Sequence, residues 1–322
     1  MENFTLKQLR YFEAVALHAH FGRAATACSV SQPAISVQIK ELEDALGQPL
    51  FERQARSVRL TSFGEVFADR AKDILRAVDD LSDLARSSGE ELVGPLRIGI
   101  IPTIGPYLLP QVVTDLSAAF PQADLRIRET QTQSLIQDLK NGTLDAALLA
   151  LPISETELVE MPLFSECFVL VRPKADADKP VPTGQSLAQM RLLLLEEGHC
   201  FRDQALDFCR MPLARPSETM DGSSLSTLVQ MVATGLGVTL IPEMAVALET
   251  SATDVSTAKF PKPEPKRTIG LVWRARSPLE DHLKRVAQRI QIAATRQTLK
   301  NPTSADAGVQ KISGRGRMAK RP

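Results

Sequence analysis

From Pro95 onward the chain alternates short apolar segments with amphipathic ones, and this alternation limits the fold more than any other feature of the sequence. Seven segments have the length and apolar character of strands: 96–101, 125–130, 145–151, 167–173, 192–197, 238–242 and 268–274. Segments with helical periodicity lie between them, among them 107–120, 133–141 and 224–237. Alternating strands and helices predict mostly parallel sheets with helices on both faces. We therefore expect an α/β region in the C-terminal two thirds of the chain.

The chain up to Gly47 follows a helical pattern instead. Ser31 is a suitable N-cap for a third helix, and Pro33 is tolerated in its first turn. The apolar residues of this helix share one face, while the opposite face carries small polar residues and glutamines that can approach base edges. Residues 49–61 then place arginines among short extended segments, which predicts a two-stranded wing on DNA phosphates. We expect a winged helix-turn-helix; the alternative is a small helical packing domain with a solvated basic loop.

The run from Leu9 to Arg53 resembles the winged helix-turn-helix of LysR-type transcriptional regulators and covers this whole N-terminal domain. An alanine pair, a Ser-Gln-Pro turn, an LE-LG helix end and an LF-R wing occur in the order typical of that family. The resemblance implies double-stranded DNA as a partner, with RNA polymerase as a further one. It also implies six DNA contacts: Arg23, Gln32, Pro33, Ser36, Arg53 and Arg56.

A long helix is expected to follow, opened by a capping box of Ser62 and Glu65. Its apolar residues recur at a heptad spacing of four and three: Phe67, Ala71, Ile74, Val78, Leu81 and Ala85. Such a stripe can also pack on its own domain, and this alternative stays open. We favour a dimer, because a two-fold pair reads two half-sites on one face of the duplex. The expected assembly is a homo-oligomer, a dimer of dimers.

Two of the four cysteines, Cys200 and Cys209, lie nine residues apart in a segment of helical character. In a helix their Cα atoms would lie roughly 13 Å apart, at about 1.5 Å per residue. A disulfide tolerates only about 7 Å, so these cysteines can bond only if the segment unfolds and repacks. His199, Arg202 and a position at the start of a helix can each favour the reactive thiolate of Cys200. The pair therefore predicts a redox switch, with the other two cysteines assigned to packing.

Five blocks of the C-terminal region resemble the peroxide-sensing members of the LysR family: 99–110, 127–136, 196–209, 235–242 and 262–274. The resemblance implies that Cys200 reacts with hydrogen peroxide to give a sulfenic acid, which then condenses with Cys209 to a disulfide. It also implies a peroxide pocket with its support, formed by Thr103, Thr132, His199, Arg202, Asp203 and Arg267. The expected protein is a hydrogen-peroxide-sensing activator of oxidative-stress genes, reset by a thiol reductant system.

Two other functions stay open. One is a LysR-type regulator that takes a small metabolite in its cleft, with incidental thiols; the other is a thiol peroxidase or reductase with a recycling partner. The sequence contains no GxSxG, P-loop, HExxH or suitably placed GxGxxG motif, so an enzyme would rest on Cys200 alone, and we expect none. Without a CxxC motif or a Cys/His cluster we expect no metal and no cofactor.

The regulatory region resembles the periplasmic solute-binding proteins, in which two α/β subdomains enclose a cleft. The expected limits are a DNA-binding domain at 1–61, a linker helix at 62–90, a regulatory domain at 91–300 and a basic, disordered tail at 301–322. Subdomain I would take about 91–165 and 269–300, and subdomain II about 166–268. No run of about 18 apolar residues and no signal peptide occurs, so we expect the cytoplasm and no membrane partner.

Overall fold

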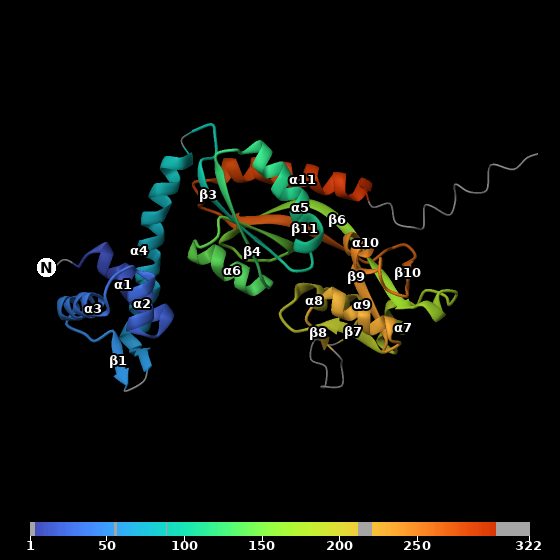
Figure 1. The fold of residues 1–322 in the computed structure, drawn as a ribbon, viewed down its shortest axis with the longest axis horizontal. Coiled ribbons are helices and arrows are strands. Elements are labelled where there is room, and N and C mark those ends of the chain that lie inside the picture. Colours follow the sequence, from blue (N-terminus) through green and yellow to red (C-terminus); the bar gives the residue numbers. More distant parts are fainter. Residues whose placement is uncertain (1–3, 55–56, 88, 212–220, 301–322) are drawn as a thin grey trace, which may run out of the picture. The chain divides into compact units, whose positions relative to one another are not determined.

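The structure is a computed structural model that describes residues 4–54, 57–87, 89–211 and 221–300 (Figure 1). The chain divides into two compact units, Met1–Ser88 and Gly89–Pro322. The first contains a helix-turn-helix, a short hairpin and one long helix, and the second is an α/β assembly. The fold class predicted from the sequence is thereby confirmed.

The first unit contains four helices and a hairpin: α1 (Leu6–His18), α2 (Phe21–Ala27), α3 (Gln32–Leu46), β1 (Phe51–Gln54), β2 (Ser57–Leu60) and α4 (Ser62–Ser87). Its core forms around Phe12, a fully buried residue whose ring packs against Phe51 and Phe67 at centroid distances of 5.2 and 5.0 Å. Ile35 and Ile39 of α3 are also fully buried, as their spacing predicts. The antiparallel pair of β1 and β2 forms the predicted wing.

The caps of α3 and α4 decide where these helices begin. Ser31 caps α3 as predicted, because its hydroxyl accepts a hydrogen bond from the Ala34 N–H at 3.3 Å. The predicted capping box at the start of α4 is wrong by one residue. Thr61 is the cap, since its hydroxyl accepts from the Gly64 N–H at 2.9 Å and its carbonyl from the Glu65 N–H. A threonine there serves the same purpose, because it satisfies N–H groups that have no partner within the helix.

The second unit is built on one continuous sheet. Its elements in chain order are β3 (Gly94–Ile100), α5 (Gly105–Ala119), β4 (Ala123–Glu129), α6 (Thr132–Asn141), β5 (Ala146–Leu151), β6 (Leu158–Pro173), η1 (Lys174–Asp176), α7 (Gly184–Ala188), β7 (Leu192–Leu195), α8 (Cys200–Phe208), β8 (Asp221–Gly222), α9 (Leu225–Ala233), β9 (Val238–Pro242), η2 (Glu243–Ala245), α10 (Val246–Glu249), β10 (Val255–Lys259), β11 (Lys266–Arg274) and α11 (Glu280–Lys300). The strands lie in the order β4-β3-β5-β11-β6-β9-β7-β8, and β10 also pairs with β6.

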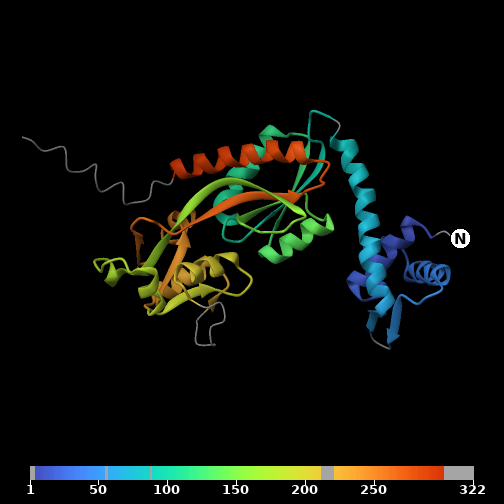
Figure 2. The same cartoon turned by 180° about the vertical axis from the view of Figure 1, so that it is seen from behind.

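Two strands, β6 and β11, carry the chain between the halves of this sheet. The outer strands are parallel as predicted, since β3 pairs with β4 and β5, and β7 with β8 and β9. β6 and β11 instead run antiparallel to each other and to their neighbours. Both extend from one half of the unit into the other (Figure 2). β6 has 16 residues, far more than the segment 167–173 predicted for it, because it serves both halves.

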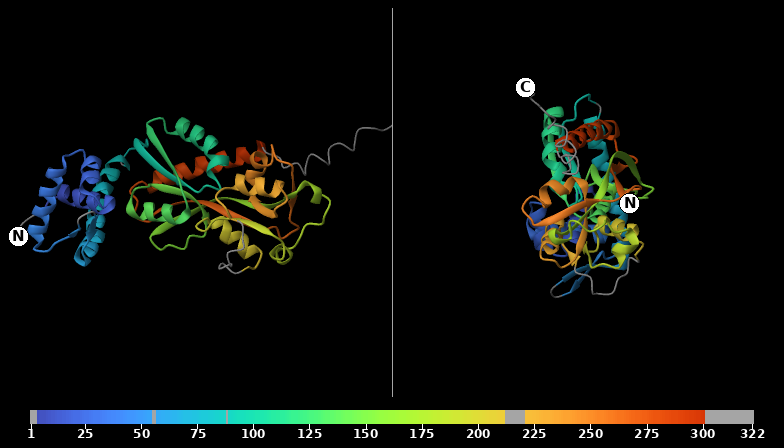
Figure 3. Two further views of the ribbon diagram at one scale, coloured as in Figure 1. Left: turned by 60° about the horizontal axis from the view of Figure 1, so that its bottom comes forward. Right: turned by 90° about the vertical axis from the view of Figure 1, so that its right-hand side faces the viewer.

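The sheet supports two hydrophobic cores, one in each subdomain. The core of subdomain I surrounds β3, β5 and Trp273 of β11, and α5 and α11 lie side by side against it (Figure 3). The core of subdomain II surrounds β7, β9 and the C-terminal half of β6, and includes one face of α8 and of α9. Among the helices that the structure describes, none is both long enough and apolar enough to cross a membrane.

Candidate functional site

Cys200 is the first residue of α8. β7 ends at Leu195, and a short loop turns the chain into α8 with His199 at the N-cap. Gly198 in this loop has a φ of 92°, a left-handed conformation that glycine adopts without strain. The Cys200 side chain is half-buried and packs against the core of subdomain I, although the rest of α8 packs in subdomain II. The thiol therefore lies where the two subdomains meet.

A small closed cleft surrounds this thiol. Its lining comes from segments that are far apart in the sequence: Ile101, Pro102 and Thr103 after β3, Gln131 and Thr132 at the start of α6, and His199 and Cys200 at the start of α8. These residues pack closely and leave no room for a molecule of metabolite size. The structure thus brings Thr103, Thr132 and His199, three of the six predicted pocket residues, together around Cys200.

The two threonines differ in their hydrogen bonds. Both are buried, with 3% of Thr103 and 9% of Thr132 exposed. Thr103 Oγ1 accepts a hydrogen bond from Arg267 Nη1 at 2.8 Å. Thr132 Oγ1, in contrast, is buried and has no hydrogen-bond partner among the described residues. A buried hydroxyl without a partner is costly, so this atom indicates a position where a ligand or a water completes the site.

Arg267 lies behind Thr103 and supports the cleft without lining it. Its buried guanidinium donates to the Thr103 hydroxyl at 2.8 Å and to the Thr103 carbonyl at 3.0 Å, and forms an ion pair with Glu166 at 2.7 Å. It also lies over the ring of Phe201, the residue after Cys200, 5.1 Å from the ring centroid. One side chain thus joins β11, β6, the segment after β3 and the first turn of α8.

His199 lines the cleft beside Cys200, and its surroundings favour a neutral imidazole. Burial lowers the pKa of its imidazole, while the negative charge of Glu196 opposes this shift. A lowered pKa leaves the ring neutral at pH 7, because the unperturbed pKa of histidine is already about 6.5. A neutral imidazole can accept a proton from the Cys200 thiol but cannot act as its counter-ion.

Arg202 and Asp203 also take positions that differ from the expected ones. The Arg202 guanidinium donates to the Leu195 carbonyl at 2.7 Å and to the Asp221 carboxylate at 3.0 Å. Asp203 is exposed in the first turn of α8, and partial enclosure raises the pKa of its carboxyl against the opposing charge of Arg202. Neither residue lines the cleft. Cys200 itself is the first residue of α8, at the N-terminal end of the helix.

Cys209 lies at the other end of α8, where it is the C-cap. Only 1% of it is exposed, and it belongs to the core of subdomain II. Both cysteines are reduced thiols. Because the whole of Cys200–Phe208 is helical, their Cα atoms lie roughly 13 Å apart, at about 1.5 Å rise per residue. This geometry supports the prediction that a disulfide between them requires α8 to unfold.

Three contributors to the site were not predicted from the sequence. Gln131 lines the cleft and donates to the Glu197 carbonyl at 3.3 Å. A Cβ atom on Gly198 would lie 2.5 Å from Gln131 Oε1, so the loop before Cys200 closes on Gln131 only with glycine at this position. Both residues lie inside segments that resemble the peroxide-sensing LysR regulators, and this resemblance could have identified them from the sequence. Glu166, the partner of Arg267, lies outside every such block.

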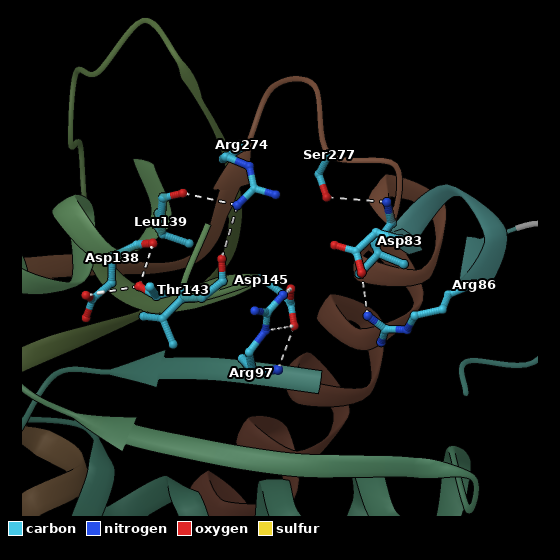
Figure 4. A network of polar contacts seen from close by, with 11 residues as sticks. Asp83, Arg86, Arg97, Asp138, Leu139, Thr143, Asp145, Arg274 and Ser277 are labelled. Carbon is cyan, nitrogen blue, oxygen red and sulfur yellow. Dashed lines mark hydrogen bonds and ion pairs between the residues drawn. The ribbon is translucent and has the colours of Figure 1, made fainter. Parts of the chain in front are cut away.

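A second ion pair, between the half-buried Arg97 and the buried Asp145, lies on the sheet of subdomain I (Figure 4). Asp145 accepts hydrogen bonds from the Arg97 backbone N–H and from its guanidinium, both at 2.7 Å. Arg274 donates to the carbonyls of Leu139 and Leu144, at the end of α6 and just beyond it. These contacts tie β3, β5, β11 and α6 together, and none of the residues lines the cleft.

The predicted DNA contacts lie in the first unit. Gln32 and Pro33 are exposed in the first turn of α3, Ser36 is half-buried one turn further, and Arg23 is exposed on α2. Arg53 lies in β1. The remaining residue of this set, Arg56, and the basic tail at 301–322 lie outside the described residues.

Helix α4 carries two apolar stripes. Ala71 and Leu75 are buried in the core of the first unit. Ile74 and Leu81 of the predicted heptad stripe are 43% and 67% exposed, and Leu84 beside them is 57% exposed. An exposed stripe at heptad spacing is typical of a helix that pairs with another helix.

Two protein families match the chain, and together they cover most of it. "Bacterial regulatory helix-turn-helix protein, lysR family" matches residues 6–65, and "LysR substrate binding domain" matches residues 89–294. The chain is 43% identical over 290 residues to the DNA-binding transcriptional dual regulator OxyR of Escherichia coli (strain K12), covering 89% of this chain and 94% of that protein. It is 46% identical over 275 residues to the probable hydrogen peroxide-inducible genes activator of Streptomyces viridosporus, covering 84% and 88%.

Solved structures give the same picture. A full-length OxyR variant from Pseudomonas aeruginosa matches with a TM-score of 0.72 and 39% identity, covering 90% of this chain and 96% of that one. A hydrogen-peroxide-bound mutant of OxyR from Corynebacterium glutamicum matches with a TM-score of 0.65 and 34% identity, covering 98% and 99%.

Proposed function

The chain belongs to the LysR family of transcriptional regulators, within its OxyR group, and we propose that it switches transcription of oxidative-stress genes in response to hydrogen peroxide. Cys200 is the sensor thiol and Cys209 the thiol that completes the switch. The observation that carries this proposal is the placement of Cys200 at the start of α8, in a closed cleft that two buried threonines line. The hydroxyl of one of them, Thr132, has no hydrogen-bond partner among the described residues.

The proposed reaction has two steps. The Cys200 thiolate attacks one peroxide oxygen, so that an S–O bond forms, the O–O bond breaks, and the departing hydroxide takes up a proton to become water. Sulfur loses two electrons in this step and becomes a sulfenic acid. The Cys209 thiol then displaces the sulfenic oxygen as a second water, which leaves a Cys200–Cys209 disulfide. A thiol reductant that returns two electrons restores both thiols.

The size and lining of the cleft favour peroxide over a metabolite. Pockets for metabolite-sized ligands usually enclose about 300–1,000 Å³, whereas the residues around Cys200 pack so closely that they leave no room for a molecule of that size. Hydrogen peroxide needs the least opening, and hydroxyl groups such as those of Thr103 and Thr132 can orient it, since each hydroxyl both donates and accepts. A neutral His199 beside them can accept the thiol proton.

The switch controls DNA binding by the first unit. Gln32, Pro33, Ser36 and Arg23 face the major groove of double-stranded DNA, while Arg53 and Arg56 on the wing contact phosphates. The exposed heptad stripe of α4 pairs two copies, and two such dimers form the working homotetramer. RNA polymerase is the further partner at an activated promoter, and a thiol reductant system of the cytoplasm resets the switch.

DNA footprints of the purified full chain test this proposal. Peroxide should change the length or position of the wild-type footprint, because remaking α8 alters the contacts that space the DNA-binding units. The Cys200→Ser protein should keep its reduced footprint in peroxide. A Cys200→Ser footprint that still responds to peroxide would refute the switch.

A turnover assay separates the regulator from a peroxidase. The wild-type protein, given excess peroxide without a thiol donor, should consume about one equivalent per Cys200 and then stop. Rapid consumption of many equivalents with a simple thiol donor, without any peroxide-dependent change of the DNA footprint, would instead support an enzyme.

A further inference from the structure

We infer that Glu166 is a positioning residue for the peroxide reaction, acting through Arg267 on the hydroxyl of Thr103. Glu166 touches neither the thiol nor the cleft lining. The inference rests on the proposed function, since it concerns how the cleft around Cys200 orients peroxide.

Glu166 is held at both carboxylate oxygens. Its Oε1 accepts from Arg267 Nε at 2.9 Å and from Arg267 Nη2 at 2.7 Å. Its Oε2 accepts from the backbone N–H of Met244, in η2, at 3.1 Å. The Arg267 side chain is fully buried and that of Glu166 is 7% exposed. A carboxylate fixed in this way leaves the guanidinium one orientation, because two of its nitrogens are bound on the Glu166 side.

That orientation decides which hydrogen bonds Thr103 can make. A guanidinium has donors and no acceptor, so Thr103 Oγ1 must be the acceptor in its 2.8 Å bond with Arg267 Nη1. The hydroxyl hydrogen of Thr103 therefore points to a different partner. Thr103 lines the cleft, so a ligand bound there can accept this hydrogen. Glu166, through Arg267, thus makes Thr103 a donor toward the ligand.

A donor at this position matters for the bond that breaks. As the S–O bond forms, negative charge accumulates on the departing oxygen of peroxide until it takes up a proton. A hydrogen bond aimed at this oxygen stabilises the transition state more than the bound peroxide. Without the Glu166 carboxylate, the buried guanidinium loses its counter-charge and its fixed orientation, and Thr103 is free to turn its hydrogen away.

The variant Glu166→Gln tests this role, because it keeps the size of the side chain and removes its charge and one acceptor. Asp145→Asn is the matched control, since Asp145 is also a buried carboxylate paired with an arginine of the same unit, and it does not line the cleft. Three quantities are measured on each full-length protein: the rate constant of Cys200 oxidation by hydrogen peroxide, the rate of Cys200 alkylation by iodoacetamide, and the melting temperature.

Peroxide oxidation of Glu166→Gln should be roughly 10- to 100-fold slower than that of the wild type, because the Thr103 donor is misplaced but not removed, and complete loss of such a donor costs about 100- to 1,000-fold. Its alkylation rate should stay within about twofold, because iodoacetamide needs the thiolate but no donor for a leaving hydroxide. Asp145→Asn should lower the melting temperature and leave both rates of Cys200 unchanged.

The results also separate this inference from the proposed function. Peroxide oxidation that is unchanged in Glu166→Gln, or that falls only as far as alkylation falls, overturns the positioning role while the wild-type switch stands. Equal slowing in Asp145→Asn overturns it as well, since a general loss of stability would then be sufficient. A wild-type protein whose Cys200 does not react with peroxide overturns the proposed function itself.

Discussion

The two ends of α8 surround their cysteines in opposite ways. At the first residue, Cys200 is half-buried among hydroxyls, an imidazole and a helix N-terminus, against the core of subdomain I. At the C-cap, Cys209 is 1% exposed within the apolar core of subdomain II. Polar groups surround the thiol at the first position, and apolar side chains surround the thiol at the second. One helix therefore carries a thiol that can react in the folded protein and a thiol that reacts only after the helix opens.

The different surroundings of Cys200 and Cys209 also determine the order of events in the proposed switch. Peroxide reaches the cleft residue first, and the modified Cys200 then has no partner within reach while α8 is intact. Opening of α8 moves Cys200 out of one core and Cys209 out of the other. Four predictions probe this contrast, from the largest expected effect to the smallest.

The largest effect concerns which cysteine is oxidised. After a short peroxide pulse, mass spectrometry should find Cys200 modified at least roughly 100-fold faster than the other cysteines, because the thiolate is the reacting form. Burial raises the pKa of the Cys167 and Cys28 thiols, which keeps both protonated. In Cys209→Ser, Cys200 should stop at the sulfenic acid. Primary oxidation of Cys209 in a Cys200→Ser protein would reverse the assignment of the two thiols.

The loop before Cys200 gives the second prediction. Gly198→Ala should slow peroxide oxidation about tenfold, since small displacements of a reacting group cost at least this much. The new Cβ would lie 2.5 Å from Gln131 Oε1 and displace this side chain from the cleft. Gly235→Ala is the control, because Gly235 also has a left-handed φ, of 81°, but open space around it. Both variants should lose about 1–3 kcal/mol of stability from backbone strain, but only Gly198→Ala should lose reactivity.

A third prediction compares the stability of the two serine variants. Cys209→Ser should destabilise the reduced protein by about 1–3 kcal/mol, because a hydroxyl is more costly than a thiol to move from water into an apolar core. Cys200→Ser should change stability by less than about 0.5 kcal/mol, since its site already contains polar groups. Urea unfolding of the two proteins measures the difference. Equal destabilisation would mean that the two ends of α8 are alike.

The smallest effect is the pH dependence that His199 contributes. Its pKa is lowered by burial in the folded state, so folding favours the neutral ring. The resulting stability is present above pH 6.5, the unfolded value, and is lost as pH falls through the lower folded value. The difference in melting temperature between the wild type and His199→Gln should therefore become smaller, by at most about 2 °C, as pH falls from 7.5 to 5.5. A difference that widens as pH falls would contradict the lowered pKa.

The first unit could be predicted closely because its signals are local. Ser31 as a cap and the spacing of Ile35 and Ile39 fix α3 with information from a few neighbouring residues. The heptad stripe of α4 agrees only in part, since Phe67 and Ala71 pack in the core of the first unit while Ile74 and Leu81 are exposed. The cap of α4 proved to be Thr61. Strand positions in the second unit were also predictable from apolar runs, since 238–242 matches β9 residue for residue.

The site could be predicted only in part, because its geometry depends on contacts between distant segments. Arg202 follows Cys200 by two residues, yet its guanidinium binds Asp221 and the Leu195 carbonyl, which no local pattern reveals. Glu166 reaches Arg267 through a strand pairing of β6 with β11, in which the two residues lie opposite each other. Antiparallel pairing of these two long strands was itself not predicted, because strand direction follows from how the chain crosses between subdomains.

The burial of Cys209 has a consequence for how easily the oxidised protein returns to its reduced state. In the proposed switch the oxidised form must give up the packing of α8, so the free energy of that packing is subtracted from the stability of the disulfide. For a two-electron couple, about 1.4 kcal/mol of such packing raises the midpoint potential by about 30 mV. A well-packed α8 thus makes the oxidised regulator easy to reduce. The same apolar contacts that keep Cys209 from reacting in the folded protein therefore favour reduction of the disulfide.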